Sequence, residues 1–118
     1  MFEKDMHIGV LLDFYGDILS ERQREMLDYY YNDDMSLSEI SDTVGISRQG
    51  VRSGIKKGTD ILIDLESKLG LAERFNSVQS QLSDISAKLK QLGASLDDPQ
   101  AIEKINTIIE QLKNLEEI

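Results

Sequence analysis

The segment SLSEISDTVGISRQGVRSGIKKG, residues 36–58, contains the signals that decide the fold of this chain. Ser36 is suited to cap the start of a helix, and Glu39, three positions later, completes a capping box. Gly45 is placed to end that short helix, and Ser47 can cap a second helix only two residues later. Two helices that meet across a tight glycine turn form the layout of a helix-turn-helix.

The second of these helices is predicted to begin at Ser47 and run to Leu69, where Gly70 is placed to end it. Arg48, Arg52 and Lys56 step by four residues and therefore share one face, with Lys57 beside them. A separate face is apolar and consists of Val51, Ile55, Leu62, Leu65 and Leu69. One face is thus expected to pack against the protein and the other to stay free for a partner.

Two more helices are predicted before this segment. The first covers about residues 5–15 and breaks at Gly16; its buried face is expected to contain Ile8, Leu11, Leu12 and Tyr15. The second is capped by Ser20 and Gln23 and ends in a turn at residues 32–34; its buried face is expected to contain Met26, Leu27 and Tyr30.

A different apolar pattern begins after Gly70. Its residues alternate steps of four and three, which is a coiled-coil seam that we predict to mediate oligomerisation: Leu71, Phe75, Val78, Leu82, Ile85, Leu89 and Leu92. Asp98 and Pro99 then form an N-cap and first-turn pair for a last helix. Its apolar residues are Ile102, Ile105, Ile109, Leu112 and Leu115. We expect an all-α protein, with a helix-turn-helix domain over residues 1–70 and a helical hairpin or coiled-coil arm over residues 71–118.

The arm leaves two arrangements open. Its two helices either pack on each other and on Leu62, Leu65 and Leu69, or they meet a partner chain to give a homodimer or a higher homo-oligomer. A dimer would present two recognition helices to DNA half-sites about 34 Å apart.

Charge is distributed unevenly along the chain. The 118 residues carry 13 Lys and Arg against 22 Asp and Glu, a formal net charge of −9. The window of residues 43–59 nevertheless holds four basic residues and no acidic one, while 11 acids precede it and 11 follow it. A solvent-facing helix also collects basic residues without any nucleic-acid role, but here the absence of acids coincides with the helix-turn-helix layout.

The basic window supplies candidate nucleic-acid contacts. The second helix of a helix-turn-helix enters the major groove with its N-terminal residues at base edges, so Arg48, Gln49 and Arg52 are predicted to read bases. Ser47 and the helix N-terminus are predicted to meet a phosphate, and Lys56 and Lys57 to contact the DNA backbone. The same helix carries Gly50, Gly54 and Gly58 at steps of four. Either these three glycines form a bare ridge that lets another backbone come close, or tertiary packing tolerates a helix whose intrinsic stability the glycines lower.

Composition excludes several other classes of protein. The chain has no Cys, so disulfides and thiolate metal sites are ruled out. We find no Gly-rich phosphate loop, nucleophile elbow or acid/base dyad, and we expect no enzyme, no cofactor and no metal. The N-terminal sequence MFEKDMHIGV lacks the pattern of a signal peptide, and no apolar run is long enough to span a bilayer. A cytoplasmic protein with no membrane association is expected.

The sequence also resembles known families. Residues 19–58, LSERQREMLDYYYNDDMSLSEISDTVGISRQGVRSGIKKG, resemble the DNA-binding region 4 of bacterial sigma factors in the patterns L-S-x-x-Q-R and S-L-x-E-I-x-x-x-x-G-I-S-R. Compared with that pattern, Gly54 replaces an apolar residue and Ile55 follows one place later. The whole length, including DFYGDILSERQREMLDYYYNDD and the tail after KLGL, is similar to the YlxM family of small bacterial helix-turn-helix proteins. That resemblance implies a regulatory role linked to the signal recognition particle and protein export.

Two functions follow as hypotheses. The first is a DNA-binding regulator that uses the basic face to bind duplex DNA. The second is a non-enzymatic adaptor, in which the same fold holds a protein or the RNA of the signal recognition particle. The salt dependence of binding would separate them, because phosphate contacts release counterions, with a slope of about −0.9 per contact on duplex DNA and about −0.7 on single strands, whereas a protein-only interface responds far less.

Overall fold

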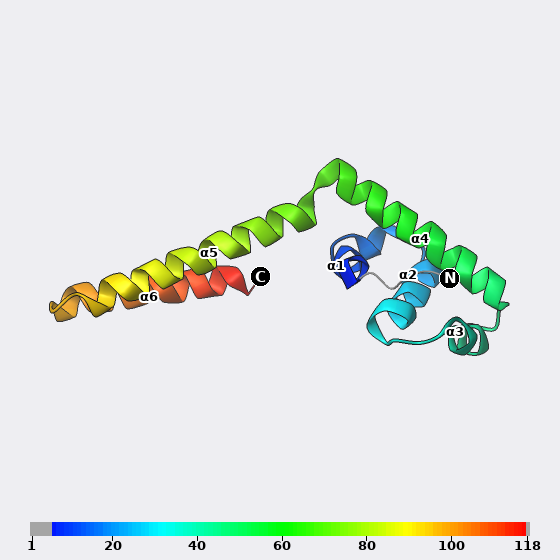
Figure 1. The fold of residues 1–118 in the computed structure, drawn as a ribbon, viewed down its shortest axis with the longest axis horizontal. Coiled ribbons are helices and arrows are strands. Elements are labelled where there is room, and N and C mark those ends of the chain that lie inside the picture. The colour runs from blue at the N-terminus through cyan, green and yellow to red at the C-terminus, as the bar shows by residue number, and fades with distance from the viewer. Residues whose placement is uncertain (1–5, 118) are drawn as a thin grey trace. The chain divides into compact units, whose positions relative to one another are not determined.

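The computed structural model describes residues 6–117, and the regular structure of this range is entirely helical (Figure 1). The elements in chain order are α1 (Met6–Tyr15), the 3₁₀ turn η1 (Gly16–Ile18), α2 (Glu21–Leu27), the π-helical turn η2 (Asp28–Asn32), α3 (Leu37–Val44), α4 (Arg48–Leu69), α5 (Leu71–Ala94) and α6 (Pro99–Glu116). The predicted all-α class is confirmed. Contacts between Cα atoms separate two compact units, the first ending at Ala72 and the second beginning at Glu73.

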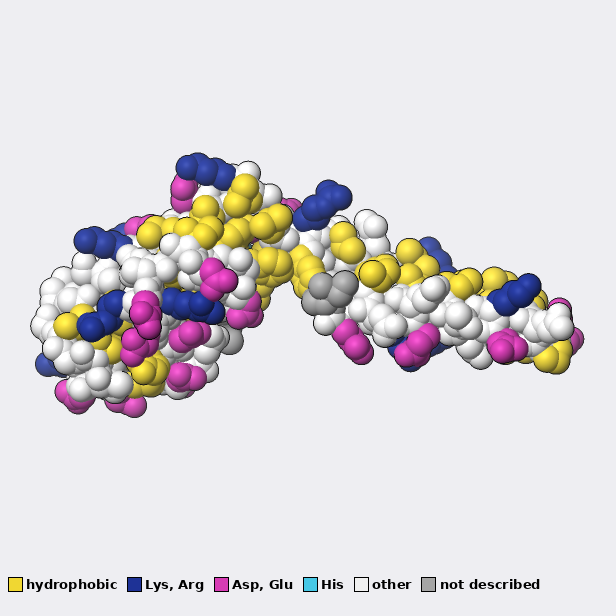
Figure 2. Space-filling model, turned by 180° about the vertical axis from the view of Figure 1, so that it is seen from behind, with side chains coloured by type: hydrophobic (Ala, Val, Ile, Leu, Met, Phe, Trp, Pro, Cys, Tyr) yellow, Lys and Arg dark blue, Asp and Glu magenta, His cyan; other side chains and the backbone are white. Residues whose placement is uncertain are grey.

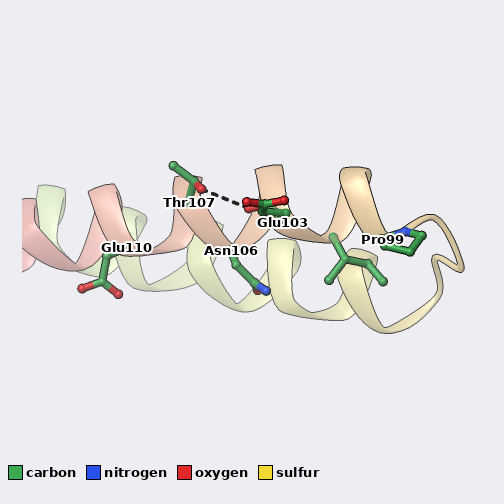
Figure 3. Close-up of a pocket in the computed structure, with 6 residues that line it drawn as sticks. Pro99, Glu103, Asn106, Thr107 and Glu110 are labelled. Atoms are coloured by element: carbon green, nitrogen blue, oxygen red, sulfur yellow. Dashed lines mark hydrogen bonds between the residues drawn. The ribbon is translucent and has the colours of Figure 1, made fainter.

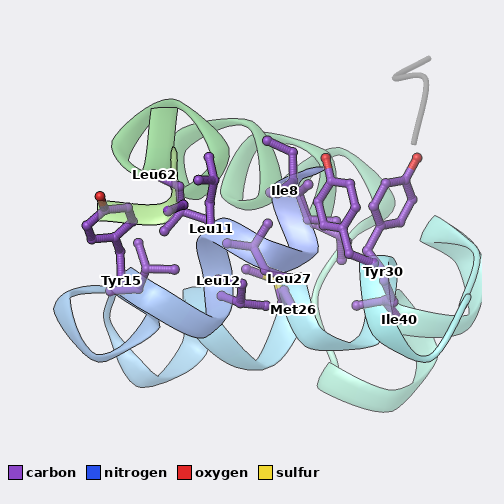
Figure 4. Packing of buried hydrophobic residues seen from close by; sticks show 14 residues of the cluster. Ile8, Leu11, Leu12, Tyr15, Met26, Leu27, Tyr30, Ile40 and Leu62 are labelled. Carbon is purple, nitrogen blue, oxygen red and sulfur yellow. The ribbon is translucent and has the colours of Figure 1, made fainter. Parts of the chain in front are cut away.

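The first unit buries one apolar core, to which α1, α2, α3 and α4 all contribute (Figure 4). The residues predicted for the faces of the first two helices are all buried: Ile8, Leu11, Leu12, Tyr15, Met26, Leu27 and Tyr30. From the helix-turn-helix, Ile40, Val51, Ile55 and Leu62 are completely buried. Full burial of a large aliphatic side chain contributes about 1.5–3 kcal/mol, so these four positions hold α3 and α4 in place.

The helix ends follow the predicted caps. The Ser20 and Gln23 side chains each accept a hydrogen bond from the other residue's N–H at 3.2 Å, which is a complete capping box. Ser36 and Glu39 form the second box. Asp5, the predicted start of the first helix, lies outside the described residues.

The α2 helix continues into a segment that the sequence pattern did not predict. Residues 28–32 widen into a π-helical turn, and Asp34, in the turn predicted at residues 32–34, has a φ of +53°. The wider turn places two consecutive aromatic residues, Tyr30 and Tyr31, in the core, with their rings edge to face and their centroids 5.0 Å apart. Apolar periodicity at 3.6 residues per turn cannot predict this change of pitch.

The glycines of α4 allow α2 to approach it closely. A Cβ atom added at Gly58 would lie 2.6 Å from Leu27 Cδ1, and one added at Gly54 would lie 2.4 Å from Met26 Cε. Real Cβ atoms do not come so near to other carbon atoms. Gly54 and Gly58 therefore face the core, and side chains of α2 in the same chain occupy the space beside them. This also explains Gly54 in place of an apolar residue, because Met26 occupies the space.

Tyr15 joins α1 to the junction between α4 and α5. Its hydroxyl donates a hydrogen bond to Glu66 Oε1 at 2.6 Å and accepts one from the Leu71 N–H at 3.1 Å. The same Glu66 oxygen accepts a hydrogen bond from the Ala72 N–H at 3.0 Å. Burial raises the pKa of Tyr15 above its ordinary value, and the hydrogen bond to Glu66 raises it further. The junction thus depends on a protonated phenol.

Replacing Tyr15 by Phe should therefore change how stability depends on pH. Because the folded-state pKa of Tyr15 is raised, the stabilisation from its hydroxyl is present below the ordinary value of 10.0 and is lost as pH rises through the folded-state pKa. We expect the wild type to be the more stable protein at neutral pH and the difference in unfolding free energy to shrink above pH 10.0. Urea denaturation of both proteins over this pH range measures it. A difference that stays constant at alkaline pH would contradict the role assigned to the phenol.

The second unit is an antiparallel hairpin of α5 and α6, one of the two arrangements expected for the arm. Gln79 Nε2 donates a hydrogen bond to the Glu116 carbonyl at 2.6 Å near the open end. Near the closed end, a Cβ atom at Gly93 would lie 3.5 Å from Ile105 Cγ2, which is ordinary contact. Asp98 caps α6 by accepting a hydrogen bond from the Gln100 N–H, with Pro99 in the first turn, as predicted.

The hairpin divides the predicted seam between two environments. The inner row, meaning the buried and half-buried residues where the helices meet, comprises Gln79, Leu82, Ser86, Leu89 and Gly93 of α5 and Ile102, Ile105, Ile109, Leu112 and Glu116 of α6. The other seam residues, Leu71, Phe75, Val78, Ile85 and Leu92, are exposed. Only two of the seven seam positions therefore belong to the contact between α5 and α6.

Candidate nucleic-acid interface

The turn between α3 and α4 is held by backbone geometry and one side chain. Gly45 ends α3 with φ +82°, in the left-handed region that favours glycine. The Ser41 hydroxyl donates a hydrogen bond to the Ile46 carbonyl across the turn. Ser47 then caps α4 by accepting a hydrogen bond from the Gly50 N–H at 3.0 Å. These contacts fix the direction in which α4 leaves the turn.

The predicted contact residues come together on one exposed face at the start of α4. Arg48, Gln49, Arg52, Lys56 and Lys57 are all exposed, whereas Val51, Ile55 and Gly58 on the opposite side of the helix are buried. We call the five exposed residues the basic face. The structure therefore separates the packing side of this part of α4 from its polar side, as the sequence predicted. At the far end of the helix the prediction was wrong for Leu69, which was assigned to the packing side but is 56% exposed.

Ser47 differs from the other predicted residues in what its side chain does. It is exposed, but its hydroxyl oxygen is engaged in the cap. A phosphate at this end of α4 would be met by backbone N–H groups and the positive end of the helix dipole. The first turn of α4 contains no acidic residue that would oppose it.

One lysine of the basic face pairs with an acidic side chain. Lys56 Nζ lies 3.4 Å from Asp60 Oδ2, one helical turn further along α4, and both side chains are largely exposed. Such exposed pairs contribute little, so a phosphate can replace Asp60 as the partner of Lys56. The sequence interpretation overlooked the Lys56–Asp60 pair, although its spacing of four residues makes it visible in the sequence.

Other kinds of site find little support among the described residues. Residues 6–117 contain no group of three or more His, Cys, Asp or Glu side chains placed to hold a metal ion. In the same range no helix is long and apolar enough to cross a membrane. A depression of about 610 Å³ lies along α6, lined by Pro99, Ile102, Glu103, Asn106, Thr107 and Glu110 (Figure 3). Since a single helix supplies its whole lining, it is an open surface hollow and not an enclosed ligand cavity.

Comparison with known proteins places this architecture in a family. A family model described as "UPF0122: Putative helix-turn-helix protein, YlxM / p13 like" matches residues 2–108. This chain belongs to the UPF0122 family. The match covers both the helix-turn-helix and most of the α5–α6 hairpin, so the resemblance seen in the sequence is confirmed.

Curated UPF0122 proteins are similar to this chain over nearly their whole length. The relative from Acetivibrio thermocellus is 37% identical over 113 residues, which are 93% of this chain and 97% of the relative. The relative from Shouchella clausii is 35% identical over 98% of this chain and 100% of its own length. One from Listeria welshimeri is 34% identical with the same coverage. The family is described by its helix-turn-helix, and its description names no catalytic activity.

Proposed function

We propose that this UPF0122 protein is a non-enzymatic cytoplasmic regulator that binds duplex DNA through the basic face of α4. One observation carries the proposal. The first ten residues of α4 present Arg48, Gln49, Arg52, Lys56 and Lys57 to solvent from a helix whose other side is buried in the core. A rigid helix with one polar, basic side is what a major groove accepts.

Each residue of the basic face has a distinct proposed role. Arg48, Gln49 and Arg52 lie nearest the helix N-terminus and would read base edges, because Arg pairs bidentately with guanine and Gln with adenine. Lys56 and Lys57 would contact phosphates and position the helix. The capped N-terminus at Ser47 would receive a further phosphate.

The regulated process is proposed from family resemblance alone. The similarity to YlxM proteins implies a link to the signal recognition particle and protein export. The second candidate function belongs to the same context, namely an adaptor that binds the RNA of that particle or one of its proteins. The net charge of −9 repels polyanions at long range and therefore favours the protein-binding form of this adaptor. The glycine ridge no longer supports an adaptor, since Gly54 and Gly58 face α2.

A salt titration tests the DNA-binding proposal. For three or four phosphate contacts, log K should fall with log salt at a slope of about −0.9 per contact, so affinity should drop roughly 40- to 150-fold between about 50 and 200 mM salt. Fluorescence anisotropy with labelled duplex DNA measures this slope, and the signal recognition particle RNA serves as the parallel ligand. Preference for the RNA, or no binding to either, would favour the adaptor instead.

A further inference from the structure

The α5–α6 hairpin exposes a row of apolar side chains on each of its helices. On α5 the row is Val78, Ile85 and Leu92, which are 43%, 44% and 50% exposed. On α6 it contains Ile108 and Leu115, which are 42% and 49% exposed, and the half-buried Ala101. Packing of the two helices against each other leaves these side chains largely uncovered.

Both rows lie on the same side of the hairpin. Val78, Ile85 and Leu92 each precede a residue of the inner row by one position, and so do Ile108 and Leu115. One residue corresponds to a rotation of about 100° around a helix. Because α5 and α6 run antiparallel, the same offset in both helices turns both rows toward one face. We call it the apolar face.

The opposite side of the hairpin is polar. Residues that follow the inner row by one position include Ser83 on α5 and Asn106 on α6, and both are exposed. Asn106 lies in the surface hollow on α6 together with Glu103 and Glu110 (Figure 3). Figure 2 shows the same division along the hairpin, with hydrophobic side chains gathered along one edge and acidic side chains along the other. The hairpin thus has one side suited to water and one suited to burial.

We propose that the apolar face is covered by the same face of a second copy of this chain, giving a twofold dimer with a four-helix bundle. Two antiparallel helices that each expose a row of apolar side chains on the same side can form half of such a bundle. A symmetric contact of one face with itself needs no further partner, and closed twofold dimers are the commonest homo-oligomers. The proposal depends on the hairpin alone and not on nucleic-acid binding.

The size of the apolar face suits a dimer. The 18 residues of α6 extend about 27 Å, at a rise of about 1.5 Å per residue. With two helices packed about 10 Å apart, the face measures roughly 27 Å by 20 Å, or about 540 Å² in projection. The accessible area of a corrugated helix surface exceeds its projection, which brings it near the roughly 800 Å² per partner of a stable interface.

The polar residues on the apolar face indicate how salt should act. Gln81 and Lys88 on α5 and Lys104 and Gln111 on α6 also precede inner-row residues by one position and alternate with the apolar side chains, and none of them is acidic. Ion pairs between copies therefore do not drive this contact, and the long basic side chains can extend toward water. Raising the salt concentration should leave the dimer intact or strengthen it, whereas DNA binding should weaken.

Sedimentation equilibrium without DNA tests the proposal. The wild type is expected at twice the chain mass, and Ile85→Lys with Ile108→Lys at the mass of one chain. The matched control, Ser83→Lys with Asn106→Lys, adds the same charge to the polar side and should remain dimeric. Circular dichroism checks that all three proteins keep their helices. A monomeric wild type, or a dimer that survives the apolar-face substitutions, would overturn the proposal.

A second measurement keeps the test independent of folding in the lysine variants. Because the chain contains no Cys, a single introduced Cys can be cross-linked only to another copy. Ile108→Cys lies near the middle of the apolar face and should give a cross-linked dimer with a short bismaleimide, whereas Asn106→Cys should not. Equal cross-linking at the two positions would contradict the assigned face. Either failure would leave the DNA-binding proposal standing, since that is measured by the salt titration.

Discussion

Arg52→Glu combined with Lys56→Glu is expected to abolish DNA binding while leaving the protein folded. Loss of a bidentate base contact costs about 1–3 kcal/mol, and two charges of the wrong sign facing phosphates add repulsion. Together these effects should lower the affinity for duplex DNA by at least about 100-fold. The measurement is an anisotropy titration at low salt, where wild-type binding is strongest.

The protein offers a matched control for this charge reversal. Lys68 pairs with Asp64 four residues before it, as Lys56 pairs with Asp60 four residues after it, but Lys68 lies in the last turn of α4. Lys68→Glu combined with Lys90→Glu changes the net charge by the same amount, from −9 to −13, because each Lys or Arg to Glu substitution removes two units. The control should lose little affinity. If both variants lose it equally, the effect is one of net charge and the basic face is not the site.

Folding should survive the Arg52→Glu/Lys56→Glu change because both residues are exposed. Exposed charge pairs such as Lys56 and Asp60 contribute at most about 1 kcal/mol. The variant should therefore keep the circular dichroism spectrum and nearly the melting temperature of the wild type. If the variant lost both its structure and its binding, the loss of affinity would be explained by unfolding and would not support the basic face as the binding site. If the folded variant kept full affinity, Arg52 and Lys56 would not belong to the interface.

Gly58→Leu is expected to be the most damaging single substitution proposed for α4. Even one added carbon would lie 2.6 Å from Leu27 Cδ1 and 3.4 Å from its Cγ, and Leu27 is completely buried. A leucine adds four carbons at this point, so α2 and α4 must separate. We expect a loss of about 3 kcal/mol or more and a melting temperature lower by at least about 12 °C.

Alanine substitutions along the ridge provide a graded comparison. Replacing Gly by Ala in a helix gains up to about 1 kcal/mol, so the sign of each change depends on the space at that position. At Gly50 the nearest atom is the exposed Ser47 Oγ at 3.3 Å, and we expect little change. At Gly54 the obstacle is the end of the flexible Met26 side chain, so the loss should be small.

Gly58→Ala should be the only clearly destabilising member of the alanine series and should lower the free energy of unfolding by about 1–2 kcal/mol. The reason is that the branched Leu27 side chain is less flexible than that of Met26. Urea denaturation of the three variants ranks them directly. Similar stability in all three would mean that α2 and α4 can separate without cost, and the close approach would then not explain the ridge.

Much of the first unit could be predicted because its signals act over a few residues. A capping box joins positions three apart, and the left-handed φ at Gly45 concerns one residue, so Ser20, Ser36 and Ser47 could be placed without knowing the fold. The alternation of buried Val51 and Ile55 with exposed Arg52 and Lys56 also follows from helical spacing alone. The exposure of the basic face could therefore be predicted from the sequence, and its contacts with nucleic acid stay a prediction.

In the second unit, the pairing of α5 with α6 could not be predicted from the sequence. The heptad seam was correctly placed on a helix, but its periodicity could not say which side α6 would cover. The hairpin takes Leu82 and Leu89 into its contact and leaves Ile85 exposed. Ile108, which the sequence pattern had not marked, is also exposed. The apolar face exists only once the two helices are paired, because its two halves come from segments about two dozen residues apart.

The sequence by itself determined the all-helical class, the helix boundaries at their caps and the basic face of α4, since each follows from the backbone and a neighbour within one turn. Only the tertiary structure decided the direction of the glycine ridge, the π-helical turn that buries Tyr30 and Tyr31, and the hydrogen bond between Tyr15 and Glu66, 51 residues apart. These features depend on which surfaces meet when the helices pack. Spacing along one helix cannot specify them, because a contact between distant residues is set by the shapes of both surfaces.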